Sequence, residues 1–134
     1  CWSLVGSEMC IRDSPLAMRS ANAVLDLLLE NDFLSNLRKM IVYFDKKMDE
    51  LIKNDMQNNP IIFAKKGSGM LRGFQLNEDV TAGDFSNIAR EKSLLLVGAA
   101  ENTIRLLPPL NTSKEEVDNA FDILNDIVLE LKKT

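Results

Sequence analysis

The sequence predicts an α+β fold in which helices pack on one face of a small antiparallel sheet. Apolar residues recur at helical spacing in four segments, and short β-prone runs occur in pairs joined by turn residues. No strand–helix–strand unit repeats along the chain, so a parallel sheet is not expected. The 134 residues, 46% hydrophobic and 27% charged, have the size and composition of one globular domain.

Two helices are predicted in the N-terminal part of the chain. Ser14 and Pro15 form an N-cap and first-turn pair for a helix that runs to about Leu29. Asn31 or Asp32 can cap a second helix. The apolar residues of the second helix recur at steps of three and four and are expected to face the core together: Leu34, Leu37, Ile41, Phe44, Met48 and Leu51.

A first hairpin is predicted after the polar loop at residues 54–60. Its strands, 61–64 and 70–76, flank the turn 67–69 (GSG), where glycine adopts positive φ at little cost. We favour a plain hairpin over a phosphate-binding loop, because no helix follows the glycines. Arg72 lies in the second strand, and the sequence leaves open whether it faces solvent or pairs across the strand.

A short helix at 81–92 and a second hairpin are predicted next. The hairpin strands are 94–97 and 103–107, linked by residues 98–102. A capping box at 113–116 (SKEE) opens the last helix. Its core-facing residues are expected to be Val117, Ala120, Phe121, Leu124, Ile127, Val128 and Leu131.

The most informative residue is Arg105, a single charge in an apolar run that ends at Pro108 and Pro109. The prolines remove amide donors, so Arg105 is expected near a strand end. Its guanidinium needs an anion, and its planar donors fit a carboxylate two bonds at a time. That carboxylate is either an Asp or Glu of the same chain or the carboxylate of an amino-acid substrate.

The residues around Arg105 resemble a known family. Gly98, Glu101, Asn102 and the run IRLLPPL at 104–110 are similar to the C-terminal signature of class III pyridoxal-phosphate-dependent aminotransferases, most closely the acetylornithine aminotransferase group. In that family the arginine of the R-L-x-P-P-L motif binds the substrate α-carboxylate. The resemblance therefore implies that Arg105 is a substrate-binding residue.

Three further segments resemble family motifs in the same order. They are PLA at 15–17, KGSGML at 66–71 and REKSLLLV at 90–97, the last with Ser93 where the family usually has glycine. The resemblance covers about nine-tenths of this chain but only the last third or so of a family member. It implies the small C-terminal domain of fold type I enzymes.

The resemblance also implies what the chain lacks. The family forms an aldimine between pyridoxal phosphate and a lysine in an upstream segment of the S-K-A-L-G-G-G type, which does not occur here. We therefore expect no catalytic and no cofactor-binding residue in this chain, and no activity from it alone. The implied parent enzyme is a homodimer that transfers an amino group between N-acetylornithine and 2-oxoglutarate in arginine biosynthesis. Ornithine, succinylornithine and 4-aminobutyrate stay open as substrates.

Three regions are expected along the chain. Residues 1–13 do not resemble the family, and VGSEMCIRD at 5–13 resembles translated sequencing-adapter read-through, so we expect a non-native leader. A signal peptide would need a positive start and an apolar core, which are missing here, and a disordered tail is the other alternative. Residues 14–30 are expected to connect two domains and to carry an uncovered leucine face, and 31–134 to form the small domain.

Charge and composition exclude several classes. The net charge is −4 without a basic cluster, so nucleic acid is not an expected partner. Apolar runs are too short to span a bilayer, which favours a cytoplasmic protein. Cys1 and Cys10 lie in the leader and histidine is absent, so neither a disulfide framework nor a metal site is expected. A non-catalytic amino-acid-binding α+β module and a structural dimerisation domain are the alternatives to an enzyme fragment.

Overall fold

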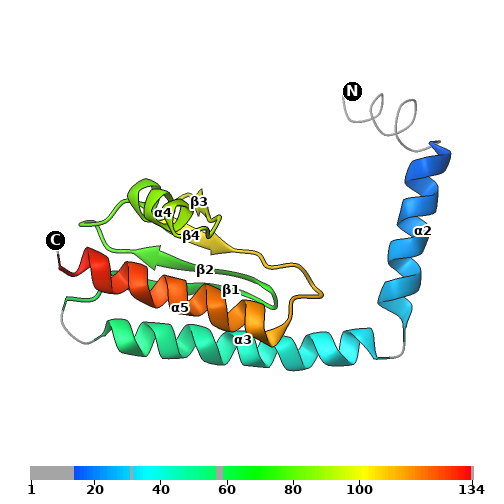
Figure 1. The fold of residues 1–134 in the computed structure, drawn as a ribbon, viewed down its shortest axis with the longest axis horizontal. Helices are drawn as coiled ribbons and strands as arrows, with labels where there is room; N and C mark the ends of the chain where they lie inside the picture. The colour runs from blue at the N-terminus through cyan, green and yellow to red at the C-terminus, as the bar shows by residue number, and fades with distance from the viewer. Residues whose placement is uncertain (1–13, 31, 57–58, 134) are drawn as a thin grey trace. The chain divides into compact units, whose positions relative to one another are not determined.

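The computed structural model describes residues 14–30, 32–56 and 59–133 (Figure 1). The expected leader at 1–13, with both cysteines, and the candidate cap Asn31 lie outside the described residues. The chain divides between Arg38 and Lys39 into two compact units.

The first unit contains helix α2 (Pro15–Leu29), with the bounds that the sequence predicts. The Ser14 hydroxyl accepts a hydrogen bond from the Ala17 amide at 3.5 Å, and Pro15 opens the first turn, where its missing N–H is not needed. No residue of α2 is buried. Among the described residues, no helix is long and apolar enough to cross a membrane.

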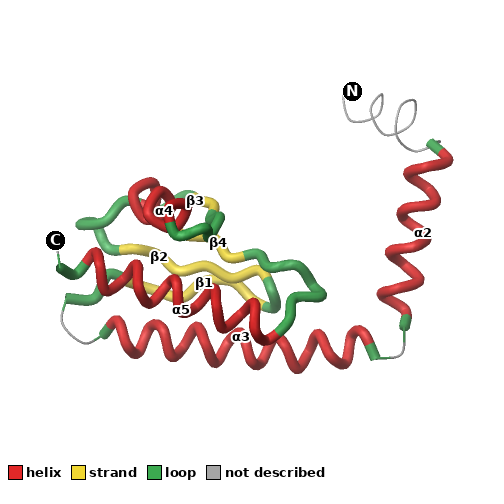
Figure 2. The backbone as a smooth tube through the Cα atoms, in the orientation of Figure 1, coloured by secondary structure: helices red, strands yellow, loops and turns green. Residues whose placement is uncertain are grey.

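The second unit is a four-stranded antiparallel sheet with helices on one face (Figures 1 and 2). The strands lie in the order β1-β2-β4-β3. The predicted α+β class is confirmed. The elements that follow α2 are α3 (Phe33–Asp55), β1 (Ile62–Ser68), β2 (Leu71–Leu76), α4 (Ala82–Glu91), β3 (Val97–Ala99), β4 (Thr103–Leu106) and α5 (Lys114–Leu131).

Aromatic pairs join the helices to each other and to the sheet. Phe44 of α3 meets Phe121 of α5 edge to face, with ring centroids 5.2 Å apart. Phe85 of α4 meets Phe74 of β2 in the same way, at 5.5 Å. All four rings belong to one buried cluster, so α3, α4 and α5 share the same core.

The predicted core stripe of α3 is correct only in its C-terminal half. Phe44, Met48 and Leu51 are buried, whereas Leu34 is 47% exposed. Leu37 and Ile41, predicted with them, are only partly buried. The reason is that the core is built by the second unit, which begins at Lys39 within α3. Met40 and Tyr43 pack against this core instead of Ile41.

The polar loop predicted at 54–60 begins too early, because α3 continues to Asp55, which is 1% exposed. One carboxylate oxygen of Asp55 accepts the Ile62 amide at 2.7 Å, and the other lies 2.9 Å from the ammonium of Lys132. A buried carboxylate is tolerated when it is paired in this way. Asp55 therefore ties the end of α3 to the start of β1 and to the end of α5.

The turn of the first hairpin lies one to two residues beyond its predicted centre, Ser68. Ser68 still pairs with Leu71, so the connection consists of Gly69 and Met70. Gly67, predicted in the turn, stays in the ladder with φ +90°. A Cβ there would lie 2.3 Å from the carbonyl oxygen of Leu71, so glycine is required.

The strand predicted at 94–97 is wrong for its first three residues, because β3 comprises only Val97–Ala99. The Leu94 amide donates to the Ala89 carbonyl at 2.8 Å, after Ser93 with φ 65°. This is the left-handed residue that ends a helix in a Schellman motif, a position that favours glycine. Leu94 is thus part of the end of α4 and not of the sheet.

Replacing Ser93 with glycine is expected to stabilise the protein. Ser93→Gly should raise the free energy of unfolding by about 0.5–1 kcal/mol, since glycine adopts positive φ without a steric cost. Urea denaturation measures the change. Ser93→Ala keeps the Cβ and should give no gain, and an equal gain with alanine would show that the left-handed backbone is not the cause.

Candidate functional site

The candidate site depends on how the side chains of β4 alternate between the two faces of the sheet. Ile104 and Leu106 are 0% and 7% exposed and face the helices, whereas Arg105 between them is exposed. Successive residues of a strand point to opposite faces, so burying the two neighbours directs Arg105 to the face that the helices do not cover. We call this the open face of the sheet.

Arg105 belongs to a row of residues that crosses the open face. It pairs with Val97 of β3 on one side and with Gly73 of β2 on the other, and Gly73 pairs with Lys66 of β1. Directly opposed residues of antiparallel strands share a face, so Lys66 and Arg105 flank a glycine on the same side. The centre of the row therefore carries no side chain.

A hollow of about 440 Å³ lies on the open face around this row. Lys66, Gly73, Arg105 and Glu101 line it, and Leu71 gives it an apolar wall. Arg105 also lines a second hollow of about 320 Å³ beside the residues that follow β4. Arg105 therefore borders a hollow on each of two sides.

Within the described part of the chain, none of the ion pairs contains Arg105. An internal ion pair, one of the two alternatives for this residue, therefore has no support among these residues. Lys66 differs, because its ammonium pairs with the carboxylate of Glu101 in the turn between β3 and β4. The hydrogen bond from Lys66 lowers the pKa of the Glu101 carboxyl below its ordinary value.

Asn102 holds that turn in place. Its side-chain amide donates to the carbonyls of Asn77 and Val80, and its oxygen accepts the Ala82 amide, each at 2.7 Å. Its φ is 49°, and asparagine adopts this left-handed conformation more readily than most residues. The sequence motif contains Asn102 without indicating these hydrogen bonds, although asparagine in a turn commonly bonds to nearby backbone groups.

Arg72, whose direction the sequence left open, points to the helix side of the sheet. Its guanidinium lies 2.9 Å from the Asp45 carboxylate of α3 and donates to the Gly67 carbonyl at 2.7 Å. Lys65 of β1 pairs with Asp45 at 2.9 Å and with Asp49 at 2.6 Å. Lys65 and Arg72 together lower the pKa of the Asp45 carboxyl, and the two aspartates raise the pKa of Lys65.

Comparison with known proteins identifies the family. A family model described as aminotransferase class III matches residues 12–128. The chain belongs to the class III aminotransferases. The expectation from the sequence motifs is thereby confirmed for a region that contains Arg105 and most of the described residues.

Several known aminotransferases are similar to this chain. Acetylornithine aminotransferase 1 of Bradyrhizobium diazoefficiens is 33% identical over 107 residues, 80% of this chain and 25% of the relative. Ornithine aminotransferase of Staphylococcus carnosus is 34% identical over 114 residues, 85% of this chain and 27% of the relative. The crystal structure of acetylornithine aminotransferase from Elizabethkingia anophelis aligns with a TM-score of 0.74 at 26% identity, covering 87% of this chain and 30% of that chain. This class III aminotransferase chain thus spans about a quarter of the length of the curated relatives.

The lysines of this class III aminotransferase chain do not fit the covalent cofactor that the family implies, pyridoxal phosphate. An amine must be neutral to attack an aldehyde, so its pKa has to be lowered. Carboxylate partners instead raise the pKa of Lys47 and Lys65. Four other lysines are ion-paired: Lys46, Lys66, Lys92 and Lys132. The remaining four are exposed at the surface: Lys39, Lys53, Lys114 and Lys133.

Asn102 is expected to stabilise the turn through both its side chain and its backbone conformation. Asn102→Gly keeps the left-handed backbone and removes three hydrogen bonds, so the free energy of unfolding should fall by about 2 kcal/mol. Asn102→Ala should cost about 1 kcal/mol more, because alanine is strained at this φ. Chemical denaturation measures both losses. A glycine variant as stable as the wild type would mean that the hydrogen bonds add nothing.

Asp45 should make stability sensitive to acid. Because its pKa is lowered on folding, its contribution is complete above the ordinary aspartate pKa of about 4 and is lost as the pH falls through the folded value. Asp45→Asn should cost about 1 kcal/mol at pH 7, since Arg72 loses its carboxylate and the 36% exposure of the Asp45 side chain weakens this ion pair. The unfolding free energies of wild type and variant, measured from pH 7 to pH 2, should converge at low pH. A constant difference over this range would contradict the assignment.

Proposed function

We propose that this chain is the C-terminal part of a pyridoxal-phosphate-dependent aminotransferase in which Arg105 binds a substrate carboxylate. One observation carries the proposal: Arg105 is exposed in a hollow of the open face and belongs to none of the ion pairs among the described residues. The packed core fixes the strand, and the guanidinium that the strand carries stays open to solvent. Such a guanidinium can bind a carboxylate. Family membership supplies the class of reaction.

Arg105 acts by orientation in this proposal. Its guanidinium forms two parallel hydrogen bonds to the carboxylate, which fixes the rotation of the substrate as well as its position. The carboxylate end of the substrate is then anchored, which limits the positions from which its free amine can reach the reacting centre. The buried side chains of Ile104 and Leu106 fix the strand that carries the guanidinium. The backbone at Arg105 therefore needs little further ordering when a ligand binds.

N-acetylornithine is the proposed amino donor and 2-oxoglutarate the acceptor, with arginine biosynthesis as the pathway. The names of the relatives favour this substrate, and the ornithine aminotransferase among them makes ornithine the second candidate. The carboxylate on the α-carbon is common to both donors, so Arg105 serves either. Discrimination between them therefore rests on groups that contact the other end of the donor.

The remaining parts of the proposal concern the parent enzyme. It uses pyridoxal phosphate as cofactor, works as a homodimer in the cytoplasm, and supplies the Schiff-base lysine from a segment outside this chain. Residues 1–13 are a non-native leader in this proposal, 14–30 connect two domains, and 31–134 form the small domain. The 134-residue chain alone is expected to show no transaminase activity and no aldimine absorbance that survives dialysis.

Changing Arg105 is expected to weaken carboxylate binding, and removing its charge to abolish it. N-acetylornithine titrated into the 134-residue chain should shift the amide signals of residues next to Arg105 in two-dimensional NMR spectra. Arg105→Lys keeps the charge and loses the paired hydrogen bonds, so affinity should fall about tenfold, and Arg105→Gln should remove binding. Arg90→Gln, which removes an exposed arginine from α4, is the control. Binding unchanged by Arg105→Gln would refute the proposed role.

A chimera distinguishes an enzyme part from a binding module. Residues 15–134 replace the matching C-terminal segment of the Bradyrhizobium diazoefficiens relative. Turnover of N-acetylornithine that depends on Arg105 supports the enzyme. A folded chimera with bound cofactor and no turnover would favour a module that binds amino acids without reaction.

A further inference from the structure

We propose that Lys66 is a second carboxylate contact beside Arg105, so that this hollow binds the acceptor, which has two carboxylates, more tightly than the donor, which has one. The inference rests on the proposed function, because it takes Arg105 as the first carboxylate contact. It adds a specificity-determining residue from a different strand. The ligand class is a short dicarboxylate, of which 2-oxoglutarate and glutamate are examples.

The register of the sheet brings the two cations together. Lys66 and Arg105 both pair with Gly73 from opposite sides, so they are two strands apart in one row of the open face. With about 4.8 Å between neighbouring strands, their Cα atoms lie about 10 Å apart. Both side chains are long and flexible and can converge above the glycine.

Gly73 makes room for a ligand between the cations. A Cβ at this position would lie 2.7 Å from the carbonyl oxygen of Ile104 and 3.2 Å from the methyl group of Thr103. Close packing of β2 on β4 therefore requires glycine here, and the floor of the hollow stays flat. The hollow of about 440 Å³ that contains both cations is large enough for a small diacid.

Lys66 forms an ion pair with Glu101 that a ligand would have to replace. The side chains of Lys66 and Glu101 are 39% and 70% exposed, and an ion pair so open to water contributes little free energy. A carboxylate of the ligand can therefore replace that of Glu101 at Lys66. The Glu101 side chain then rotates towards solvent at a small cost in free energy. The hollow then holds two cations matched by the two carboxylates of one ligand.

Competition between a diacid and a monoacid tests the inference. Glutarate and butyrate, which differ by one carboxylate on a similar carbon chain, are titrated separately into the 134-residue chain and followed by NMR. Glutarate should bind roughly fivefold more tightly, the upper end for an exposed ion pair. Lys66→Gln should abolish this preference and leave butyrate binding unchanged. Glu101→Gln should increase the preference, because Lys66 loses its competitor.

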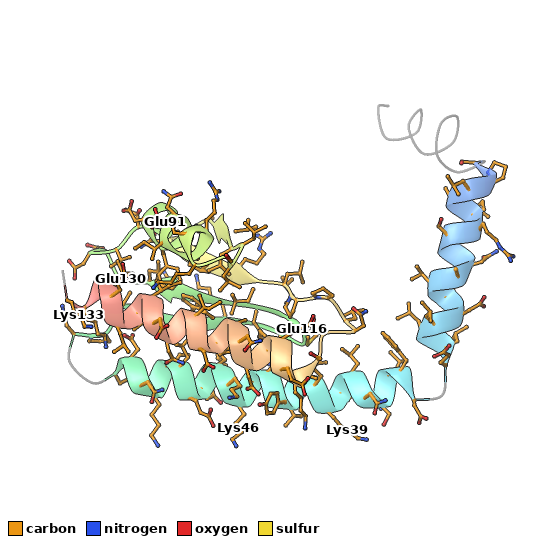
Figure 3. The ribbon with its side chains drawn as sticks, in the orientation of Figure 1. Lys39, Lys46, Glu91, Glu116, Glu130 and Lys133 are labelled. Atoms are coloured by element: carbon orange, nitrogen blue, oxygen red, sulfur yellow. The ribbon has the colours of Figure 1, made fainter. Side chains whose placement is uncertain are left out.

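Lys46→Gln is the matched control. Lys46 also pairs with a glutamate, Glu50, at 3.7 Å, and its side chain is 71% exposed on α3 (Figure 3). The substitution makes the same change in net charge at a site that does not line the hollow, so the glutarate preference should persist.

The outcomes separate the two proposals. If Lys66→Gln leaves the glutarate preference intact, Lys66 is no second contact, and the role of Arg105 stands. If Arg105→Gln leaves butyrate binding unchanged, the proposed function fails. A loss of preference in Lys66→Gln and Lys46→Gln alike would show that net charge, and not Lys66, sets the preference. Absence of binding by both acids would overturn both proposals.

Discussion

The burial of Ile104 and Leu106 on β4 is the constraint on which the candidate site depends. Each side chain removed from water contributes about 1.5–3 kcal/mol, and both are almost inaccessible. A shift of one residue in strand pairing would turn both to the open face and bring Arg105 into an apolar core. The free energy that sets the register of the strand is thus the same free energy that places the guanidinium on the open face. Ile104 and Leu106 therefore determine the position of Arg105 through the stability of the fold, although neither residue contacts the ligand.

The starts of helices are predicted well from the sequence, because the groups that cap a helix lie within a few residues of one another. The capping box of Ser113 and Glu116 is present in full, and Ser14 caps α2 as expected. The end of α4 was harder to predict because Ser93 adopts a left-handed backbone without the glycine that would announce it. The apolar run after Ser93 therefore predicts a strand that begins three residues before β3 does.

Tertiary partners could not be predicted from the sequence. Arg72 and Asp45 are far apart in the chain, and nothing local to either residue indicates the other. The same is true of Tyr43, whose hydroxyl donates to Asp118 of α5 at 2.6 Å. Arg105 itself was found from its unusual place in an apolar run and from the family motif around it. Its neighbour across the sheet, Lys66, depends on strand register, which the sequence predicted only approximately.

The adjacent lysines of β1 show how the sheet separates two uses of charge. Lys65 faces the helices, where Asp45 and Asp49 both neutralise it, and it fastens β1 to α3. Lys66 faces the other way and meets a single carboxylate from a turn, in contact with water. A cation that packs against α3 and is partly removed from water needs carboxylate partners, since an unpaired one would weaken the fold. A cation on the open face is exposed to water and does not need a fixed partner. Lys66 can therefore exchange one carboxylate partner for another. Alternation along one strand therefore places a structural cation and a ligand-accessible cation side by side in the sequence.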